Sequence, residues 1–234
     1  MTGAGTLINV GAILAGTAAG VALGHRLPER LQQRVLAGLG LITLVLGVDL
    51  ALAWRDTSAL YVLGGVLLGG LAGEWLRLED RLEDLGFALQ HRLSTDGEPS
   101  KIAEGFVTAS LLFCIGPLAV IGSFDDALRG DTTALATKSV LDGFAALALA
   151  AALGWGVGLS ALAVLVYQGA LTLLAGTLDG VLEGEALAAM TSAGGILIVG
   201  IALKLLDIKD VRVGNFLPAL LFASLLVGAW SLVS

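Results

Sequence analysis

The sequence predicts an all-α integral membrane protein, one domain over residues 1–234, built as a polytopic helical bundle of about eight transmembrane helices. Two observations predict this class. Hydrophobic residues make up 56% of the chain and charged residues 14%, and the mean hydropathy of +0.91 is far above that of soluble domains. The apolar runs are also long and unbroken, whereas the strands of a membrane β-barrel would alternate over about ten residues.

Charge and motif content narrow the function classes. The net charge of −7 comes from loops and helix ends, and no basic patch carries interleaved aromatic residues, so no nucleic-acid partner is expected. The single cysteine, Cys114, excludes an intrachain disulfide and a cysteine metal cluster. No phosphate-binding loop, dinucleotide fingerprint or zinc-protease motif occurs. We therefore expect no enzyme activity, no metal site and no cofactor.

Eight apolar runs are long enough to span a bilayer, which requires about 20 residues. They are 6–24, 35–54, 58–76, 102–122, 133–153, 157–176, 186–204 and 214–232. The first run has no Lys or Arg before it, so we interpret it as a retained span rather than a cleaved signal. The expected division is a first helical half at 1–76, a surface segment at 77–100 and a second half at 101–234.

The basic residues of the connections predict the orientation. One side collects ten of them, which are Arg26, Arg30, Arg34, Arg77, Arg81, Arg92, Lys101, Lys204, Lys209 and Arg212. The opposite side collects Arg55 and Arg129. The richer side is expected to be cytoplasmic, so both termini are predicted to face outward.

Glycines recur at every fourth residue in two of the spans. They are Gly16, Gly20 and Gly24 in the first span, and Gly65, Gly69 and Gly73 in the third. This spacing leaves a groove along one helix face. The simplest interpretation is close packing within the subunit, and the alternative is that these glycine-lined faces form a homodimer.

The segment 77–100 combines an amphipathic helix with a polar linker. Its leucines recur at helical spacing between charges, so we expect the helix to lie on the inner membrane surface or to extend the third span. The linker at 94–100 follows it. In the fourth span, Gly116 and Pro117 predict a break that could act as a hinge, because proline removes a backbone hydrogen bond. The acids Asp125, Asp126 and Asp131 then form either a solvated loop or a cation-attracting mouth.

The run 133–153 contains the charges that are hardest to explain structurally. Lys138 and Asp142 are four residues apart, so they lie on one face of a helix. Asp142 would sit about 13 Å from the start of the span, near the bilayer centre. An ionisable group at that depth typically marks a transport path. One alternative is an ion pair with a purely structural role. A second is that the span starts near Val140, which would place both charges at the membrane interface.

A weak internal similarity relates 11–24 to 169–184, each followed by a glycine-rich span. If spans one to three repeat as spans six to eight, the two copies face opposite ways, as in the inverted repeats of transporters. Chance similarity in glycine- and leucine-rich sequence is the alternative.

Several stretches resemble a known family. They are GTLINVGAILAG at 5–16, GLGLITLVLG at 38–47, KSVLDGFAALALAAALGWGV at 138–157, TSAGGILIVGIALKLL at 191–206 and VGNFLPALL at 213–221. Together they resemble the bacterial inner-membrane family called domain of unknown function 554, which includes YqgA- and YdfK-type proteins. The resemblance covers nearly the whole chain and implies a multi-pass protein of the bacterial cytoplasmic membrane. It implies no activity.

The residues themselves predict a transporter for a small ion or polar solute. The pathway candidates are Asp142, Lys138, Asn9, Ser192, Asn215 and Glu104, although Glu104 is near a span end where it could simply reach water. Oxygen-rich ligands favour a hard cation or a proton-coupled polar solute. The expected partners are the lipid bilayer and the transported solute. A non-transporting membrane scaffold that docks through 77–93, or a passive ion channel, are the alternatives.

Overall fold

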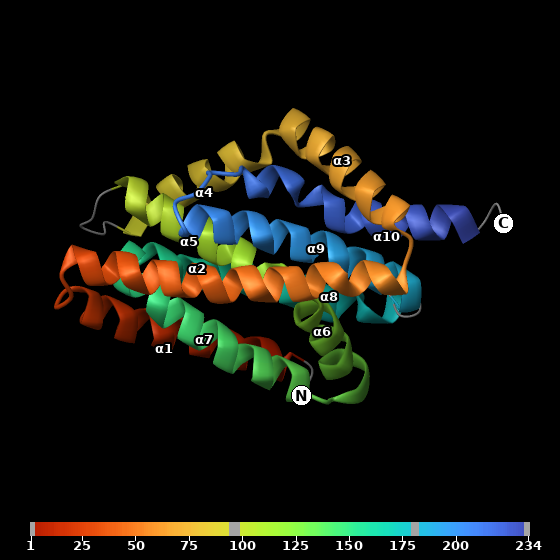
Figure 1. Ribbon diagram of the computed structural model, residues 1–234. Helices are drawn as coiled ribbons and strands as arrows, with labels where there is room; N and C mark the ends of the chain where they lie inside the picture. The colour runs from red at the N-terminus through yellow and green to blue at the C-terminus, as the bar shows by residue number, and fades with distance from the viewer. Residues whose placement is uncertain (1–2, 94–98, 179–182, 232–234) are drawn as a thin grey trace. The chain divides into compact units, whose positions relative to one another are not determined.

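The computed structural model describes residues 3–93, 99–178 and 183–231, and all regular structure within them is helical. This confirms the predicted all-α class. In chain order the elements are α1 (Ala4–Gly24), α2 (Glu29–Ala51), η1 (Leu52–Asp56), α3 (Ala59–Leu76), α4 (Leu78–Leu93), α5 (Pro99–Cys114), α6 (Pro117–Arg129), α7 (Thr133–Leu153), α8 (Gly156–Leu178), α9 (Gly184–Leu205), η2 (Val213–Phe216) and α10 (Pro218–Ser231) (Figure 1).

Six helical segments in the described ranges are long and apolar enough to cross a membrane. They are α1, α2 together with η1, α3, α7, α8 and α9. Two of the eight runs expected to span the membrane do not form single long helices. The run at 102–122 is not one helix, because α5 and α6 meet at a bend of 61°, and the pair counts as a seventh span only if it crosses as a unit. The run at 214–232 forms a shorter apolar helix within Val213–Ala229. Eight continuous spans are therefore not observed.

The chain packs as two compact units that do not follow the expected halves at 1–76 and 101–234. Unit 1 consists of residues 1–39, 81–114 and 118–176, and unit 2 consists of residues 40–80, 115–117 and 177–234. Each unit takes helices from both halves of the sequence. The proposed repeat stays a prediction, because its second copy includes residues 179–182, which lie outside the described ranges.

In unit 1, α1 and α7 lie side by side along their lengths (Figure 1). The glycine series of α1 makes this possible. A Cβ added at Gly16, Gly20 or Gly24 would come closer than 3.0 Å to the α7 backbone, nearer than real side chains approach. Glycine therefore lets the two backbones touch, the usual way in which membrane helices gain packing contacts.

In unit 2, the second glycine series does the same for α3. Gly65 and Gly69 pack on Ala223 and Ala219 of α10, and Gly73 packs on the Asn215 backbone in η2. Both glycine faces are thus covered inside the chain, in line with the packing interpretation. A homodimer would have to use another surface.

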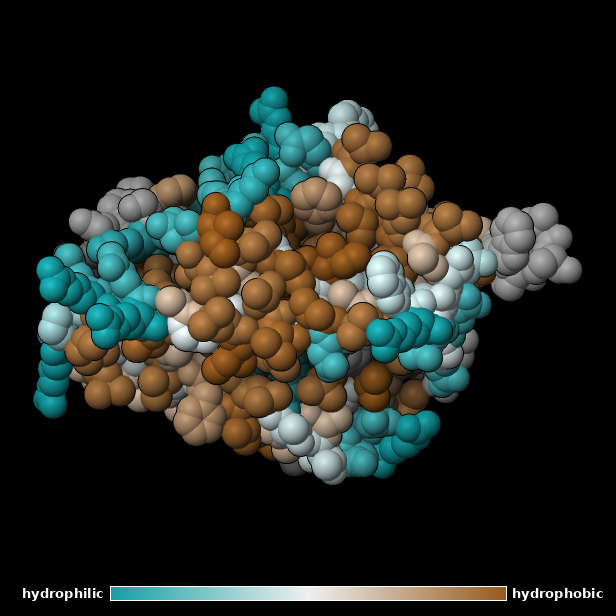
Figure 2. All heavy atoms as spheres, viewed as in Figure 1, coloured by the Kyte–Doolittle hydropathy of each residue, from teal (hydrophilic) through white to brown (hydrophobic). Residues whose placement is uncertain are grey.

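The exposed surface of α2 fits a lipid environment. Leu41, Ile42 and Val45 each expose more than half of their surface. In Figure 2 the middle of α2 is hydrophobic, and hydrophilic side chains gather toward its two ends. Such an apolar band between polar ends matches a helix that crosses a membrane.

The amphipathic helix α4 is separate from the third span. Arg77 has left-handed backbone angles (φ 49°) and ends α3, so α4 does not continue it. Within unit 1, Gly86 of α4 lies against Ala103 and Phe106 of α5, where an added Cβ would approach both to 3.2 Å. One part of α4 therefore packs on protein rather than on lipid alone.

Asp131 fixes the start of α7. Its Oδ1 accepts a hydrogen bond from the Thr133 backbone N–H at 2.9 Å. Hydrogen bonds from Thr133, first through its side chain and then through its backbone, lower the pKa of the Asp131 carboxyl below the ordinary value of 3.8. The folded state therefore prefers the carboxylate.

We expect this contact to depend on pH. Because the pKa is lowered on folding, the stabilisation is fully present above a pH of about 4 and is lost as the pH falls through the lowered pKa. Hydrogen exchange at the Thr133 amide should therefore accelerate at acidic pH, beyond the intrinsic pH dependence of exchange. In Asp131→Asn, which still offers an oxygen acceptor but does not titrate, the excess should vanish. Identical profiles for the two proteins would show that Asp131 does not hold the helix start.

Candidate functional site

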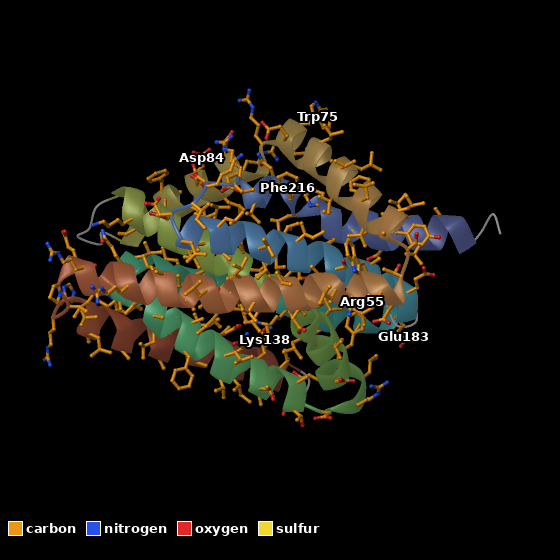
Figure 3. The ribbon with its side chains drawn as sticks, viewed as in Figure 1. Arg55, Trp75, Asp84, Lys138, Glu183 and Phe216 are labelled. Atoms are coloured by element: carbon orange, nitrogen blue, oxygen red, sulfur yellow. The ribbon has the colours of Figure 1, made fainter. Side chains whose placement is uncertain are left out.

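The site centres on the charged pair of α7. Lys138 and Asp142 form an ion pair one helical turn apart, and they are only 5% and 8% exposed. Figure 3 labels Lys138 on α7. The helix begins at Thr133, not near Val140, so Asp142 lies about 13 Å along a helix that is long and apolar enough to span a membrane. Both charges are therefore within the expected span.

Two amides surround the carboxylate of this pair. Asn9 of α1 donates through Nδ2 to Asp142 Oδ2 at 3.0 Å, and the same nitrogen lies 3.4 Å from Gln168 Oε1 on α8. Asn9 and Gln168 are fully buried. These contacts fix both amide orientations, since turning either group would set like against like. Three helices thus meet at Asp142.

Several buried polar atoms of unit 1 have no hydrogen-bond partner within the described part of the chain. The two amides of the site leave Asn9 Oδ1 as an acceptor and Gln168 Nε2 as a donor. The others are Thr6 Oγ1, Thr17 Oγ1, Ser110 Oγ, Thr172 Oγ1 and Asp126 Oδ1. Each such atom costs roughly 1–3 kcal/mol if nothing satisfies it, so a bound water or polar solute would stabilise the two amide atoms beside the pair.

Two further side chains extend the cluster toward α5 and α8. Cys114, the last residue of α5, lies near Lys138 and Asp142, and Tyr167 of α8 lies near Cys114. The cluster therefore takes groups from α1, α5, α7 and α8, all of which belong to unit 1.

The break after Cys114 is present as expected. Gly116 has φ +141°, in the region that favours glycine, and Pro117 begins α6. The bend between the two helices is 61°. The break is thus observed, and its role as a hinge stays a prediction.

Only three of the six predicted pathway residues come together. Asp142, Lys138 and Asn9 form the centre of the cluster, whereas Glu104 is an exposed residue of α5. Ser192 and Asn215 belong to unit 2. The Ser192 hydroxyl donates to the Ala51 carbonyl at 2.7 Å and so ties α9 to the end of α2.

Asn215 has a structural role in unit 2. It donates to Glu74 Oε2 at 2.7 Å and accepts from the Glu79 backbone N–H at 2.8 Å. Glu79 in turn accepts from the Gly214 backbone N–H, and Arg212 pairs with Asp80 at 2.6 Å. These bonds join η2 to the corner between α3 and α4. Asn215 therefore helps to hold that corner within unit 2.

The acidic mouth expected after the fourth span is not one group. Asp126 is 1% exposed, and its Oδ2 accepts from the Gly5 backbone N–H of α1 at 3.0 Å. Asp125 instead pairs with Arg129 one turn along α6, and Asp131 caps α7. The three carboxylates thus serve three separate contacts.

This chain is similar to one family model and to two proteins of bacteria. The family model described as "Protein of unknown function (DUF554)" matches residues 4–228. The chain is 32% identical over 225 residues to "Uncharacterized membrane protein YdfK" of Bacillus subtilis, with 95% of each protein covered. It is 31% identical over 231 residues to "Uncharacterized protein YqgA" of Escherichia coli, with 97% of each covered. No solved structure shows a significant match.

Proposed function

This chain belongs to the DUF554 family of membrane proteins, and from that premise we propose that it transports a small ion or polar solute across the bacterial cytoplasmic membrane. The binding site is the cluster of unit 1 around Lys138, Asp142, Asn9 and Gln168. The observation that carries the proposal is a buried ion pair in a helix long and apolar enough to span a membrane, beside two amides that each leave one polar atom without a partner among the described residues.

The two buried charges are costly for the protein to keep. An ionisable residue at the bilayer centre costs about 2.5–3.5 kcal/mol or more, and a buried ion pair is often no more stable than apolar residues of the same volume. Packing alone therefore does not explain why Lys138 and Asp142 are charged residues. A site in which the ion pair breaks and re-forms as a polar solute binds does explain it.

The cluster offers ligands for such a solute. Asn9 holds Asp142 through its amide nitrogen while its oxygen remains an acceptor, and Gln168 presents a free N–H. A solute that binds the Lys138 ammonium in place of Asp142 would leave Asp142 hydrogen-bonded to Asn9. Gly116 and the bend after α5 supply a place where the helices could adjust during this exchange.

The orientation follows the basic residues. With both termini outside, the α5–α6 pair and α10 both cross, and the ten basic residues of the inner connections face the cytoplasm. The α10 stretch is short for this task, and local thinning of the bilayer can accommodate it.

Reconstitution tests the proposal. Proteoliposomes that contain the purified chain should take up at least one of Na⁺, K⁺, Mg²⁺, chloride, phosphate or acetate faster than empty liposomes do, with saturation. A passive channel would not saturate or couple to a proton gradient. A scaffold would show no flux with any of these probes, and that result would refute transport of this class of cargo.

A further inference from the structure

The ion pair and the two amides beside it form a set of four buried polar groups in unit 1. Lys138 and Asp142 come from α7, Asn9 from α1 and Gln168 from α8. None of the four is within six residues, along the chain, of a part that lies outside the described ranges. The set can therefore be judged from groups whose positions are described.

The four groups are balanced in charge and in hydrogen bonding. The ammonium of Lys138 and the carboxylate of Asp142 cancel, and the two amides are neutral. Among the described residues, Asn9 Oδ1 is an acceptor without a donor, and Gln168 Nε2 is a donor without an acceptor. The set thus offers one cation, one anion, one open acceptor and one open donor.

This balance determines which charges a bound solute should carry. A solute with a single charge would pair with Lys138 or with Asp142 and leave the other buried without a partner, which weakens binding by about a hundredfold or more. An uncharged solute would replace an ion pair with weaker neutral hydrogen bonds. A solute that carries both an ammonium and a carboxylate keeps every charge paired.

The open amide atoms fit the same solute. The solute ammonium, bound to Asp142, can also donate to Asn9 Oδ1, and the solute carboxylate, bound to Lys138, can also accept from Gln168 Nε2. Each charged group of the solute would then meet one opposite charge and one amide. Both atoms that lack partners beside the pair would be satisfied.

The solute must hold its two charges close together. Lys138 and Asp142 are in direct contact one helical turn apart, so a solute that bridges them has little room between its own charges. In an α-amino acid a single carbon separates the ammonium from the carboxylate. Space for the rest of the solute is most easily made on the side of Cys114, which lies near the pair and ends α5, where the chain bends by 61°.

We infer that the site binds a small zwitterion with an ammonium and a carboxylate on one carbon, the chemistry of an α-amino acid. The binding depends on the four groups alone. That the same solute also crosses the membrane rests on the proposed function.

A ligand series on the unmodified protein tests the inference. Glycine, L-alanine and L-leucine are each compared with the analogue that lacks the ammonium and the analogue that lacks the carboxylate, which for L-alanine are propionate and ethylamine. Equilibrium dialysis of the purified full chain in nonionic detergent at neutral pH measures the affinities. At least one amino acid should bind about a hundredfold more tightly than its two analogues. An analogue that binds as tightly as its amino acid, or no binding of any of the three amino acids, would overturn the inference.

Two variants should shift the preference in opposite directions. Lys138→Gln leaves the Asp142 carboxylate, so the amine analogue should bind at least as tightly as the amino acid. Asp142→Asn leaves the Lys138 ammonium, so the carboxylate analogue should gain instead. Asp125→Asn, which removes a carboxylate on the exposed side of α6, should keep the unmodified order. Variants of the pair that keep this order would contradict the inference, and if either fails to fold, the series on the unmodified protein decides.

Binding and transport are measured separately, so the two proposals can fail independently. The amino acid that binds is added to the uptake assay in proteoliposomes, where acetate, which has no ammonium, should need a much higher concentration. If an amino acid binds and no probe is taken up, the transport proposal fails and the zwitterion site remains. If an inorganic ion is taken up and no amino acid binds, the zwitterion site is wrong and transport remains.

Discussion

Asp142→Asn is expected to reduce flux to the level of empty liposomes while the protein still assembles. Asparagine keeps the size of the side chain and an oxygen that can accept from Asn9 or Lys138, so the hydrogen bonds can persist although the ion pair is lost. What it loses is the charge that lets the pair exchange partners. Initial rates of uptake at equal amounts of reconstituted protein measure the effect.

Two controls separate a functional pair from a structural one. Asp125→Asn removes a carboxylate whose ion pair lies on the exposed side of α6, and it should transport normally. Asp142→Asn alone leaves Lys138 as an unpaired buried charge, which can cost about 3–5 kcal/mol. Lys138→Gln combined with Asp142→Asn removes that cost, so it should recover stability without flux. A double variant that transports like the wild type would show that the pair is structural.

Gly20→Ala is expected to destabilise unit 1 by at least about 1–3 kcal/mol, the usual cost of overpacking a filled interior. An added Cβ would meet the Leu147 carbonyl, the Ala150 side chain and the Ala151 backbone nitrogen, and two of these three are backbone atoms that cannot rotate away. The α1–α7 contact would have to separate, which would also displace Asn9 from Asp142. Unfolding in a denaturing detergent measures the stability change.

Gly11→Ala provides the matched control on the same helix. No atom lies within 4 Å of a Cβ at Gly11, so the substitution should be neutral or stabilise by about 0.5–1 kcal/mol through helix propensity. Equal stability of Gly20→Ala and the wild type would contradict the close backbone packing of α1 on α7.

The sequence predicts the helices and three of the four central site residues, Lys138, Asp142 and Asn9, because these depend on local patterns. Apolar length identifies the spans, and charges inside an apolar run identify Lys138 and Asp142 without knowledge of their neighbours. The glycine spacing likewise predicts close packing. It does not say which helix is the partner, and the structure assigns α7 to one series and α10 with η2 to the other.

The parts that the sequence misses depend on contacts between distant segments. The sequence does not identify Gln168 as a site residue, because a neutral amide in an apolar run is ordinary. Its role depends on the contact between α1 and α8, where Gln168 meets Asn9. The sequence groups Ser192 and Asn215 with the site because both are polar residues at membrane depth. Depth does not determine which unit a helix joins, and both residues bond within unit 2.

The bend and the acidic residues show a similar limit. Gly116 and Pro117 predict a break, but the angle of 61° and the separation into α5 and α6 depend on what each piece packs against. The sequence predicts that Asp126 lies in a loop with other acidic residues. In the structure Asp126 is part of α6 and accepts a hydrogen bond from the Gly5 backbone N–H of α1. Local sequence therefore shows where a bend or an acidic residue occurs, but the burial of each residue depends on the helix that packs against it.

Access of solute to Asn9 tests the central claim most directly. In a Cys114→Ser background, an Asn9→Cys thiol should react with a small water-soluble thiol reagent from at least one side of the membrane, and a transported probe should slow that reaction. If the thiol stays unreactive from both sides in a folded protein, no solute reaches the Lys138–Asp142 pair, and the cluster of unit 1 is not a transport site.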